Sequence, residues 1–259
     1  MEKDLFKIAH RLRQALETAQ AIRPISNEIG ASNVDEAYVI QNINHQIRVS
    51  EGFTCVGHKI GLTSKSVQQQ IGIDQPDYGR LYSYMNIKNG SPFPSSKLIL
   101  PKVEGEIAFI LGKDIEDAPS SKEEMLECID SICASIELVD SRIENWNIKI
   151  SDTIADNASA AYFVLGNERI SPHNFDFENC RMNLSINSEI VSTGTGKECM
   201  DNPVNAVLWL ANKLIDSGEH LKKGDIILSG ALGKFVDVKA GDQTTVSISG
   251  LGDVSLNLT

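Results

Sequence analysis

Cysteine is scarce in this sequence, and its spacing fits neither a disulfide framework nor a zinc site. The 259 residues include five cysteines, with no C-x-x-C pair and no Cys/His zinc spacing. An odd number without such spacing is typical of reduced, mostly buried thiols in a cytosolic protein. Paired histidines are lacking as well, which disfavours zinc as the metal of this chain. The expected reduced thiols favour a cytoplasmic location.

Long apolar runs and excess positive charge are also lacking. No run approaches the roughly 18 residues that cross a bilayer, and the first residues, Met1-Glu2-Lys3-Asp4, do not resemble a signal peptide. The formal net charge is -11, so we expect neither nucleic acid nor an anionic membrane as a partner, because both are polyanions. An anionic small substrate stays compatible, since a bound cation can reverse the local charge.

The N-terminal fifth of the chain has the periodicity of helices. Apolar residues recur at helical spacing over residues 5–22, and Pro24 ends that pattern. Ser32 and Asp35 form a capping-box pattern, which predicts a second helix that ends near Gly52. We interpret this region as a small helical subdomain.

The chain changes character after residue 53, where short apolar runs alternate with turn-forming residues. The predicted strands are residues 54–60, 103–111, 135–139, 160–165, 181–186, 226–229, 235–239, 244–249 and 254–258. Capping patterns predict two further helices, from Ser121 and from Asn202 to Gly218. Strands outnumber helices and do not alternate with them regularly, which favours an α+β class over a doubly wound sheet. We divide the chain into a helical subdomain (1–53) and a β-rich catalytic domain (54–259).

Glu104 and Glu106 lie one residue apart in an apolar run that predicts a strand. Alternate side chains of a strand share a face, and both faces are apolar towards the end of this run. Two carboxylates would then point together into the interior, which is costly without a counter-charge. A hard divalent cation bound by oxygen ligands removes that cost. The alternative is a solvated strand end.

Glu137 lies in a second short apolar segment, residues 135–140, where its charge also needs a partner. Three carboxylates, with waters and two substrate oxygens, would complete an octahedral Mg²⁺ or Mn²⁺ site. This second segment makes the solvated-end alternative for the first two acids less attractive.

Lys59 ends an apolar run and alternates with Gly57 and Gly61, so its side chain could reach into a cavity. Gly61 permits a tight turn. Residues 62–64 then lead into a predicted helix, whose free N–H groups and hydroxyls suit a carboxylate. A desolvated or metal-adjacent lysine titrates low enough to transfer protons. The alternative is a surface lysine on a connecting loop.

Two weaker signals accompany Lys59. Asp77 fits a second proton-transfer group, although a turn-forming role is favoured by its neighbours. Residues 152–159 are polar and loop-like between apolar stretches, and Ser159 there is suited to bind a substrate oxygen. Asp156 and Asn157 fit turn and cap roles better.

Together these residues resemble the fumarylacetoacetate hydrolase superfamily. The resemblance is strongest to its branch of 2-oxopent-4-enoate (2-hydroxypenta-2,4-dienoate) hydratases and 4-oxalocrotonate decarboxylases. It is carried, in order along most of the chain, by Trp146 and by residues 57–64, 68–79, 101–107, 136–143, 152–159, 209–212 and 226–230. The resemblance implies a distorted mixed β-barrel or roll with flanking helices, and a homo-oligomer that could also associate with a neighbouring pathway enzyme.

The resemblance also implies the roles of individual residues. Glu104, Glu106 and Glu137 match the ligands of Mg²⁺ or Mn²⁺ in this family.

Five further residues match other parts of the family site. Lys59 and Asp77 correspond to the residues implicated in proton transfer. Leu62, Thr63 and Ser159 correspond to the region that holds the substrate carboxylate.

The activity implied by the resemblance is hydration of 2-hydroxypenta-2,4-dienoate or a close analogue to a 4-hydroxy-2-oxo acid, in catabolism of aromatic compounds. With the substrate carboxylate and 2-oxygen on the metal, proton transfer through Lys59 or Asp77 would give an α,β-unsaturated 2-oxo acid. Water would then add to its distal alkene carbon.

Other activities stay open at this point. A 4-oxalocrotonate-type decarboxylase would use the same electron sink, and residues 231–235 match the usual sequence of neither group. Hydrolysis of a carbon–carbon bond ranks third, because no water-activating His–Glu pair is apparent near the N-terminal boundary. A non-catalytic assembly partner with this fold is a different class, against which the intact acids and Lys59 argue.

Overall fold

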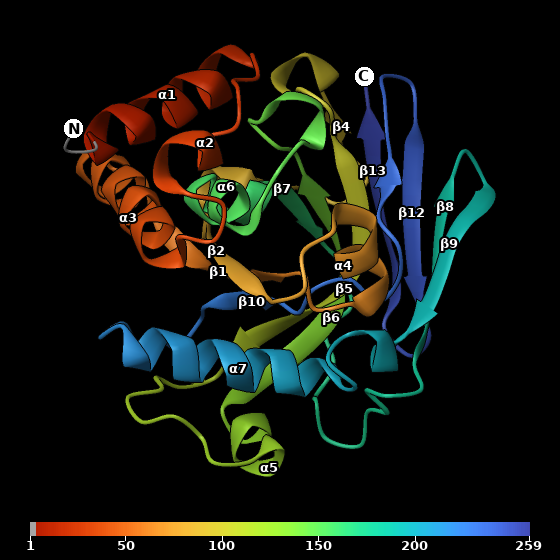
Figure 1. Ribbon diagram of the computed structural model, residues 1–259. Helices are drawn as coiled ribbons and strands as arrows, with labels where there is room; N and C mark the ends of the chain where they lie inside the picture. The colour runs from red at the N-terminus through yellow and green to blue at the C-terminus, as the bar shows by residue number, and fades with distance from the viewer. Residues whose placement is uncertain (1–3) are drawn as a thin grey trace.

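A large mixed β-sheet that curls into a half barrel forms the centre of the molecule in the computed structural model, which describes residues 4–259 (Figure 1). Its strands run in the order β2 (Asp77–Tyr82), β1 (Cys55–Gly61), β10 (Ile226–Leu228), β5 (Lys102–Leu111), β6 (Ile129–Val139), β7 (Ala160–Leu165) and β3 (Asn86–Ile87). The short strand β11 (Val236–Asp237) pairs with β5 beside this path. The two longest strands, β5 and β6, are neighbours and are buried along almost their whole length.

A second sheet packs against one face of the first. Its order is β4 (Pro92–Phe93), β13 (Gly252–Leu258), β12 (Gln243–Ile248), β8 (Arg181–Ile186) and β9 (Glu189–Thr195). The sheets approach closely behind Gly105, where an added Cβ would lie 2.9 Å from Met182 Sδ and 3.0 Å from Val246 Cγ1. The glycine between Glu104 and Glu106 thus lets the second sheet pack closely against one face of β5. Both carboxylates project from the opposite face of this strand.

Helices cover the remaining faces of the central sheet (Figure 1). The α-helices are α1 (Leu5–Thr18), α2 (Ser26–Ile29), α3 (Val34–Ser50), α4 (Lys65–Ile71), α5 (Lys122–Leu126), α6 (Ile150–Ala155) and α7 (Pro203–Asp216). The 3-10 helices are η1 (Ser83–Met85), η2 (Ser95–Lys97), η3 (Glu144–Trp146), η4 (Asn157–Ser159) and η5 (Gly196–Glu198). Within residues 4–259, none of these helices has the length and apolar character needed to cross a membrane.

The N-terminal helices pack on the segments that surround the functional residues. One hydrophobic cluster joins both parts of the chain, with Ile8, Leu12 and Ile40 from the helices and Leu62, Ile148 and Ile154 from the rest. The buried Gln41 side chain of α3 donates hydrogen bonds of 2.9 Å to the carbonyls of Tyr78 and Ile154. The division into residues 1–53 and 54–259 stays a prediction.

Several predicted boundaries differ from the structure. The first helix ends at Thr18, before Pro24, because Ala19 takes a left-handed conformation. The second begins after Asn33, whose side chain accepts the Glu36 N–H, rather than after Ser32. The predicted loop over residues 152–159 was wrong in its first half, which belongs to the buried helix α6.

Candidate active site and metal centre

Three glutamates from the two central strands converge at one point. Glu104 and Glu106 project from β5, and Glu137 of β6 lies directly opposite Glu104 in the strand register. Each offers a carboxylate oxygen, and these oxygens all lie within 4.8 Å of one another. All three residues are buried. The structure therefore brings together the acids that the sequence predicts as metal ligands.

The electrostatics of this cluster disfavour three bare charges. Burial raises the pKa of Glu104 to about 7, against the opposing effect of Lys59 and with a further rise from Glu137. Burial, together with the charges of Glu137 and Glu104, raises the pKa of Glu106 well above its ordinary value. Burial also raises the pKa of Glu137, although Lys59 opposes that rise. A nearby cation would stabilise the ionised carboxylates.

Unpaired oxygens show that the cluster fits an oxygen-ligated cation. Glu106 Oε2 accepts a hydrogen bond of 2.9 Å from the Gly230 N–H. Its other oxygen, Oε1, is buried without a hydrogen-bond partner among the described residues, as is Glu137 Oε1. Buried acceptors of this kind are costly unless something satisfies them. Carboxylate oxygens are ligands that Mg²⁺ and Mn²⁺ prefer, so the residues present fit such an ion.

Lys59 and Asp77 lie beside the glutamates. Lys59 Nζ is 3.1 Å from Glu137 Oε2. A Cβ added at Gly61 would lie 2.2 Å from Asp77 Oδ1 and 3.3 Å from Lys59 Nζ. The glycine thus leaves the space in which the carboxylate and the ammonium approach each other. The turn role favoured for Asp77 was wrong, because this residue begins the buried strand β2 and its Oδ2 accepts a 2.9 Å hydrogen bond from Thr153.

Both groups have shifted pKa values in the absence of a cation. Burial acts to lower the pKa of Lys59, but the charges of Glu137 and Asp77 outweigh it, so the pKa lies above its ordinary value. This differs from the expected low value, because acids surround the ammonium on several sides. Burial raises the pKa of Asp77, although Lys59 and the Thr153 hydroxyl oppose the rise.

The residues expected around the substrate carboxylate are divided in the structure. Leu62 and Ser159 line the pocket beside Lys59, and both have left-handed backbone conformations, with φ of 59° and 54°. Such conformations are costly for non-glycine residues and often mark functional sites. The Ser159 hydroxyl is buried without a hydrogen-bond partner among the described residues. Thr63 is not part of the pocket lining, since its hydroxyl packs against the backbone of Gly230.

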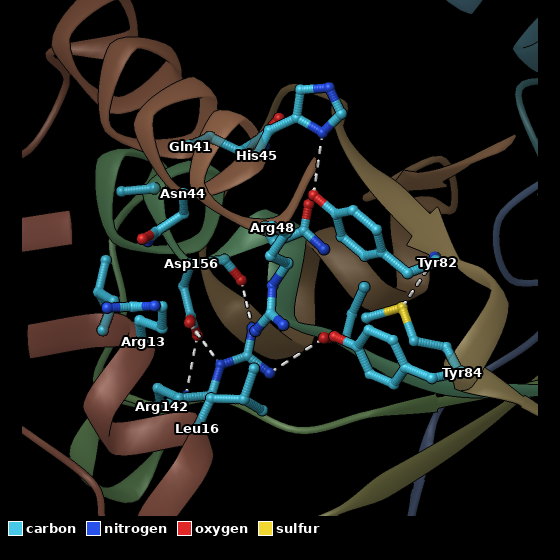
Figure 2. A pocket seen from close by; sticks show the side chains of 15 residues that line it. Arg13, Leu16, Gln41, Asn44, His45, Arg48, Tyr82, Tyr84, Arg142 and Asp156 are labelled. Atoms are coloured by element: carbon cyan, nitrogen blue, oxygen red, sulfur yellow. Dashed lines mark hydrogen bonds and ion pairs between the residues drawn. The ribbon is translucent and has the colours of Figure 1, made fainter. Parts of the chain in front are cut away.

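The side chains of Asp156 and Asn157 hold the segment that carries Ser159. Arg142 Nε donates to Asp156 Oδ1, and the Arg142 backbone N–H donates to Asp156 Oδ2 at 2.9 Å. Figure 2 shows the side chains of Arg142 and Asp156 facing each other. Asn157 Oδ1 accepts the Arg80 N–H at 2.7 Å, and its Nδ2 donates to the Arg80 carbonyl at 2.9 Å. Asp156 and Asn157 do occupy cap and turn positions, as predicted, but they also fix the Ser159 segment.

Lys59, Leu62, Asp77, Glu104 and Ser159 line one pocket that is partly open to solvent. Its lining comprises Lys59, Gly61, Leu62, Val67, Ile71, Asp77, Glu104, Val139, Trp146, Ile148, Thr153, Ala158, Ser159 and Phe235. The charged residues therefore meet a largely apolar wall within the same cavity.

Sequence reasoning missed two supporting groups, Thr153 and the Gly230 N–H. Thr153 lies on α6, a segment that the sequence pattern predicts to be a loop. No helical periodicity therefore indicated the direction of its side chain. Gly230 follows strand β10 and has a φ of 95°. Glycine after an apolar run was the available signal, but a backbone donor leaves no mark in side-chain pattern.

Comparison with known proteins identifies the family of this chain. The profile of the fumarylacetoacetate (FAA) hydrolase C-terminal family matches residues 62–258. The chain belongs to the fumarylacetoacetate hydrolase family. The solved structure of 4-oxalocrotonate decarboxylase from Pseudomonas putida G7, complexed with magnesium and adipate, superposes with a TM-score of 0.94 at 30% identity. That match covers 100% of this chain and 98% of the other, which confirms the predicted α+β fold.

Two curated relatives indicate the closer kinship within the family. The chain is 46% identical over 246 residues to 2-keto-4-pentenoate hydratase of Paraburkholderia xenovorans (strain LB400), covering 95% of this chain and 91% of the relative. It is 38% identical over 251 residues to 2-hydroxyhexa-2,4-dienoate hydratase of Comamonas testosteroni, covering 96% and 95%. The predicted branch of the family is thereby confirmed.

Proposed function

We propose that the protein is a divalent-metal-dependent hydro-lyase that hydrates 2-hydroxypenta-2,4-dienoate or a close analogue to a 4-hydroxy-2-oxo acid. The observation that carries this proposal is the convergence of three buried glutamates beside Lys59, in contact with a pocket that Lys59, Asp77 and Glu104 line. The names of the relatives, which are hydratases of small dienoic acids, support the same reaction.

Glu104, Glu106 and Glu137 would hold Mg²⁺ or Mn²⁺ through their carboxylate oxygens. When bound, such an ion supplies Lewis acidity and a template for the carboxylate and 2-oxygen of the substrate. Relatives of this fold contain magnesium and, in a fumarylpyruvate hydrolase, manganese. The substrate carboxylate would lie towards Leu62 and Ser159, whose hydroxyl lacks a partner among the described residues.

The protein's own groups provide the proton transfers. Lys59 holds a proton at Nζ within the cavity, because the neighbouring carboxylates favour its charged form. Asp77 faces the same space, and the Thr153 hydroxyl fixes the orientation of its carboxylate. Transfer of the 2-hydroxyl proton to a carbon of the diene through one of these groups would give the unsaturated 2-oxo acid, to which water adds.

A 4-oxalocrotonate-type decarboxylase is the second candidate. The observation in its favour is the solved decarboxylase, which superposes over the full length of this chain. The same glutamates would serve that reaction, because loss of CO₂ also leaves an enolate that needs a neighbouring cation. The higher identity to hydratases, 46% against 30%, makes hydration our first choice.

We further propose a cytoplasmic homo-oligomer that acts in catabolism of aromatic compounds and could associate with a neighbouring pathway enzyme. The names of the relatives support the metabolic setting. Light scattering after size-exclusion chromatography tests the assembly, and a monomeric mass would contradict it.

Ultraviolet absorbance of 2-hydroxypenta-2,4-dienoate tests the reaction. With protein and Mg²⁺ or Mn²⁺, we expect loss of the diene signal and formation of the 4-hydroxy-2-oxo acid, and neither should occur in EDTA. Release of CO₂ from 4-oxalocrotonate, without hydration of the dienoate, would select the decarboxylase instead. Metal binding without turnover of either compound would contradict both candidates.

A further inference from the structure

The pocket has two chemically different ends. Lys59, Asp77 and Glu104 lie at one end, beside the metal centre. Apart from Leu62 and Ala158, which adjoin the residues at the charged end, the apolar part of the lining comprises Val67, Ile71, Val139, Trp146, Ile148 and Phe235. Among the described lining residues, Lys59 is the one cation, and its charge already faces Glu137. A substrate anchored at the glutamates would therefore place its distal carbons against apolar side chains.

An aromatic pair, Trp146 and Phe235, forms part of this apolar end. Their ring centroids are 6.0 Å apart with an interplanar angle of 30°. The indole Nε1 of Trp146 donates a 2.8 Å hydrogen bond to the Leu100 carbonyl, which fixes the ring. Asn145 and Trp146 have φ values of 57° and 55°, an uncommon conformation for non-glycine residues. The chain thus holds this ring in place at a cost in backbone energy.

A second cation lies behind the aromatic pair. Lys102 precedes Glu104 by two residues on β5 and so belongs to the same face of the strand. Its Nζ lies 5.4 Å from the centroid of the Trp146 ring and 5.0 Å from that of Phe235, and it pairs with Asp237. Lys102 is not among the lining residues of the pocket. The two rings therefore stand between the cavity and a charge that could otherwise receive a second carboxylate.

We infer that Trp146 and Phe235 determine specificity by accepting a substrate with an uncharged, apolar tail and by keeping a terminal carboxylate away from Lys102. This rests on the proposed function, because it assumes that the 2-oxo acid end lies at the glutamates. An ionised carboxylate against apolar side chains loses hydration without gaining a partner. An added methyl group on the substrate tail changes kcat/KM only modestly in such a pocket. The pocket therefore discriminates between substrates by the charge of the tail rather than by its length.

The kinetic test compares three substrates with the Mg²⁺-loaded protein. We expect similar kcat/KM values for 2-hydroxypenta-2,4-dienoate and 2-hydroxyhexa-2,4-dienoate. For 4-oxalocrotonate, whose tail is a carboxylate, we expect a value roughly 100-fold or more lower, because its buried charge has no partner. Phe235→Ala should narrow that ratio roughly 10-fold by uncovering Lys102. Phe53→Ala, which removes an exposed aromatic ring outside this pocket, serves as the control.

A binding test avoids dependence on turnover. The chain has two tryptophans, so Trp209→Phe leaves Trp146 as the fluorescent reporter in the pocket. With Mg²⁺ present, 2-oxohexanoate should change this fluorescence at a concentration roughly 10-fold or more below that needed for 2-oxoadipate, which has the same chain length and a terminal carboxylate. Phe235→Ala should reduce the difference, and adding Lys102→Met should restore it.

The outcomes separate this inference from the proposed function. Selective binding of 2-oxohexanoate without turnover of any dienoate would leave the inference standing and contradict the hydratase. Equal affinity for the two 2-oxo acids would overturn the inference even in an active hydratase. If Phe235→Ala fails to fold, Phe235→Leu tests the same point, since it removes the ring but keeps an apolar side chain. An unchanged ratio in a folded variant also overturns the inference.

Discussion

At the scale of single residues, the proposed chemistry depends on charges that the fold keeps away from water. Glu106 is fully buried, and one of its two oxygens is satisfied by the Gly230 N–H. The other has no hydrogen-bond partner among the described residues. A carboxylate in this position costs stability unless a cation completes its surroundings. The position is therefore better explained by ligand binding than by folding.

Glu106→Gln should abolish metal-dependent turnover, because an amide oxygen is a neutral and weaker ligand for a hard cation. We expect kcat/KM to fall by about 100-fold or more, as for loss of a group that stabilises transition-state charge. Mn²⁺ titration by calorimetry should show a matching loss of affinity. Glu116→Gln, at an exposed position, is the control. Full activity in Glu106→Gln would refute the metal assignment.

His58 gives a second residue-scale prediction, which concerns stability. Both ring nitrogens are buried without hydrogen-bond partners among the described residues. Burial, reinforced by the charges of Arg80 and His45, lowers the pKa of His58 from 6.5 to about 3. The folded protein thus keeps the ring neutral while the unfolded chain binds a proton. The stabilisation is complete above pH 6.5 and is lost as the pH falls from 6.5 towards 3.

His58→Leu should remove this pH dependence. Between pH 6 and 4, the free energy of unfolding of the wild-type protein should fall more steeply than that of the variant, by up to about 1.4 kcal/mol per pH unit. Urea unfolding at several pH values measures the difference. His173→Leu, which alters an exposed histidine, should leave the slope unchanged. Identical slopes in wild type and His58→Leu would show that His58 does not titrate on unfolding.

The sequence predicts some site residues better than others. Glu104, Glu106 and Lys59 stand out because a charge in an apolar strand pattern is unusual and needs a partner. The local pattern favours a turn role for Asp77, because its neighbours are turn formers and its burial depends on distant packing, and only the family resemblance points to it as a proton-transfer residue. Thr153 carries no such conflict, since a hydroxyl is ordinary in any local setting. Its part in the site arises from the meeting of α6 and β2.

At the scale of elements, the pairing of β1 with β2 sets the distance between Lys59 and Asp77. The register places Gly61 opposite Asp77 at the end of both strands. Any side chain at Gly61 would collide with the Asp77 carboxylate, since the added Cβ would lie 2.2 Å from Oδ1. The glycine is therefore part of the geometry of the proton-transfer pair.

Gly61→Ala should impair catalysis more than folding. We expect a fall in kcat of at least about 10-fold, because the carboxylate moves from its position beside Lys59 and small displacements of catalytic groups are costly. Circular dichroism and the unfolding midpoint report the fold, and kcat and KM should be measured separately. Gly112→Ala tests a tight glycine outside the pocket, where the added Cβ would lie 3.3 Å from Asp130 Cβ. Unchanged kcat in Gly61→Ala would contradict this account.

Elements differ in how well the sequence predicts them. Strands β7 and β8 were predicted at their observed bounds, because β7 is an apolar run that ends before Gly166 and β8 alternates polar and apolar residues before Asn187. Strands β2 and β9 were missed, since their residues include glycine and polar groups that are common in turns. Helix α6 is six residues long and fully buried. Packing rather than local propensity stabilises such a short helix.

At the scale of the whole molecule, the helices and the sheet close the pocket together. Asp152 Oδ1 of α6 accepts the Ser26 N–H at 2.8 Å, and Gln41 of α3 bonds to the backbones of β2 and α6. These contacts join the N-terminal helices to the elements that carry Asp77 and Thr153. Composition and periodicity identified the helices but not this docking, which depends on contacts more than a hundred residues apart in the chain.

Metal binding and folding should therefore be linked across the molecule. Without a cation, burial and mutual repulsion raise the pKa values of Glu104 and Glu106 above their ordinary value of 4.5. The folded state then holds protons that the unfolded chain releases. In EDTA, the contribution of these two glutamates to the free energy of unfolding should consequently be greatest at acidic pH. That contribution should be lost as the pH rises from 4.5 through 7.

Bound Mn²⁺ should reverse this trend, because it stabilises the ionised carboxylates of the folded state alone. At 100 times its dissociation constant the ion adds about 2.7 kcal/mol, equivalent to a rise of about 5–10 °C in Tm for a chain of this size. Differential scanning calorimetry at pH 5 and pH 8, with Mn²⁺ or EDTA, measures both effects. Glu104→Gln should weaken each of them. If Mn²⁺ leaves the Tm unchanged at pH 8, the three glutamates do not form a metal centre. An ion bound by ligands that only the folded chain brings together must stabilise the folded state.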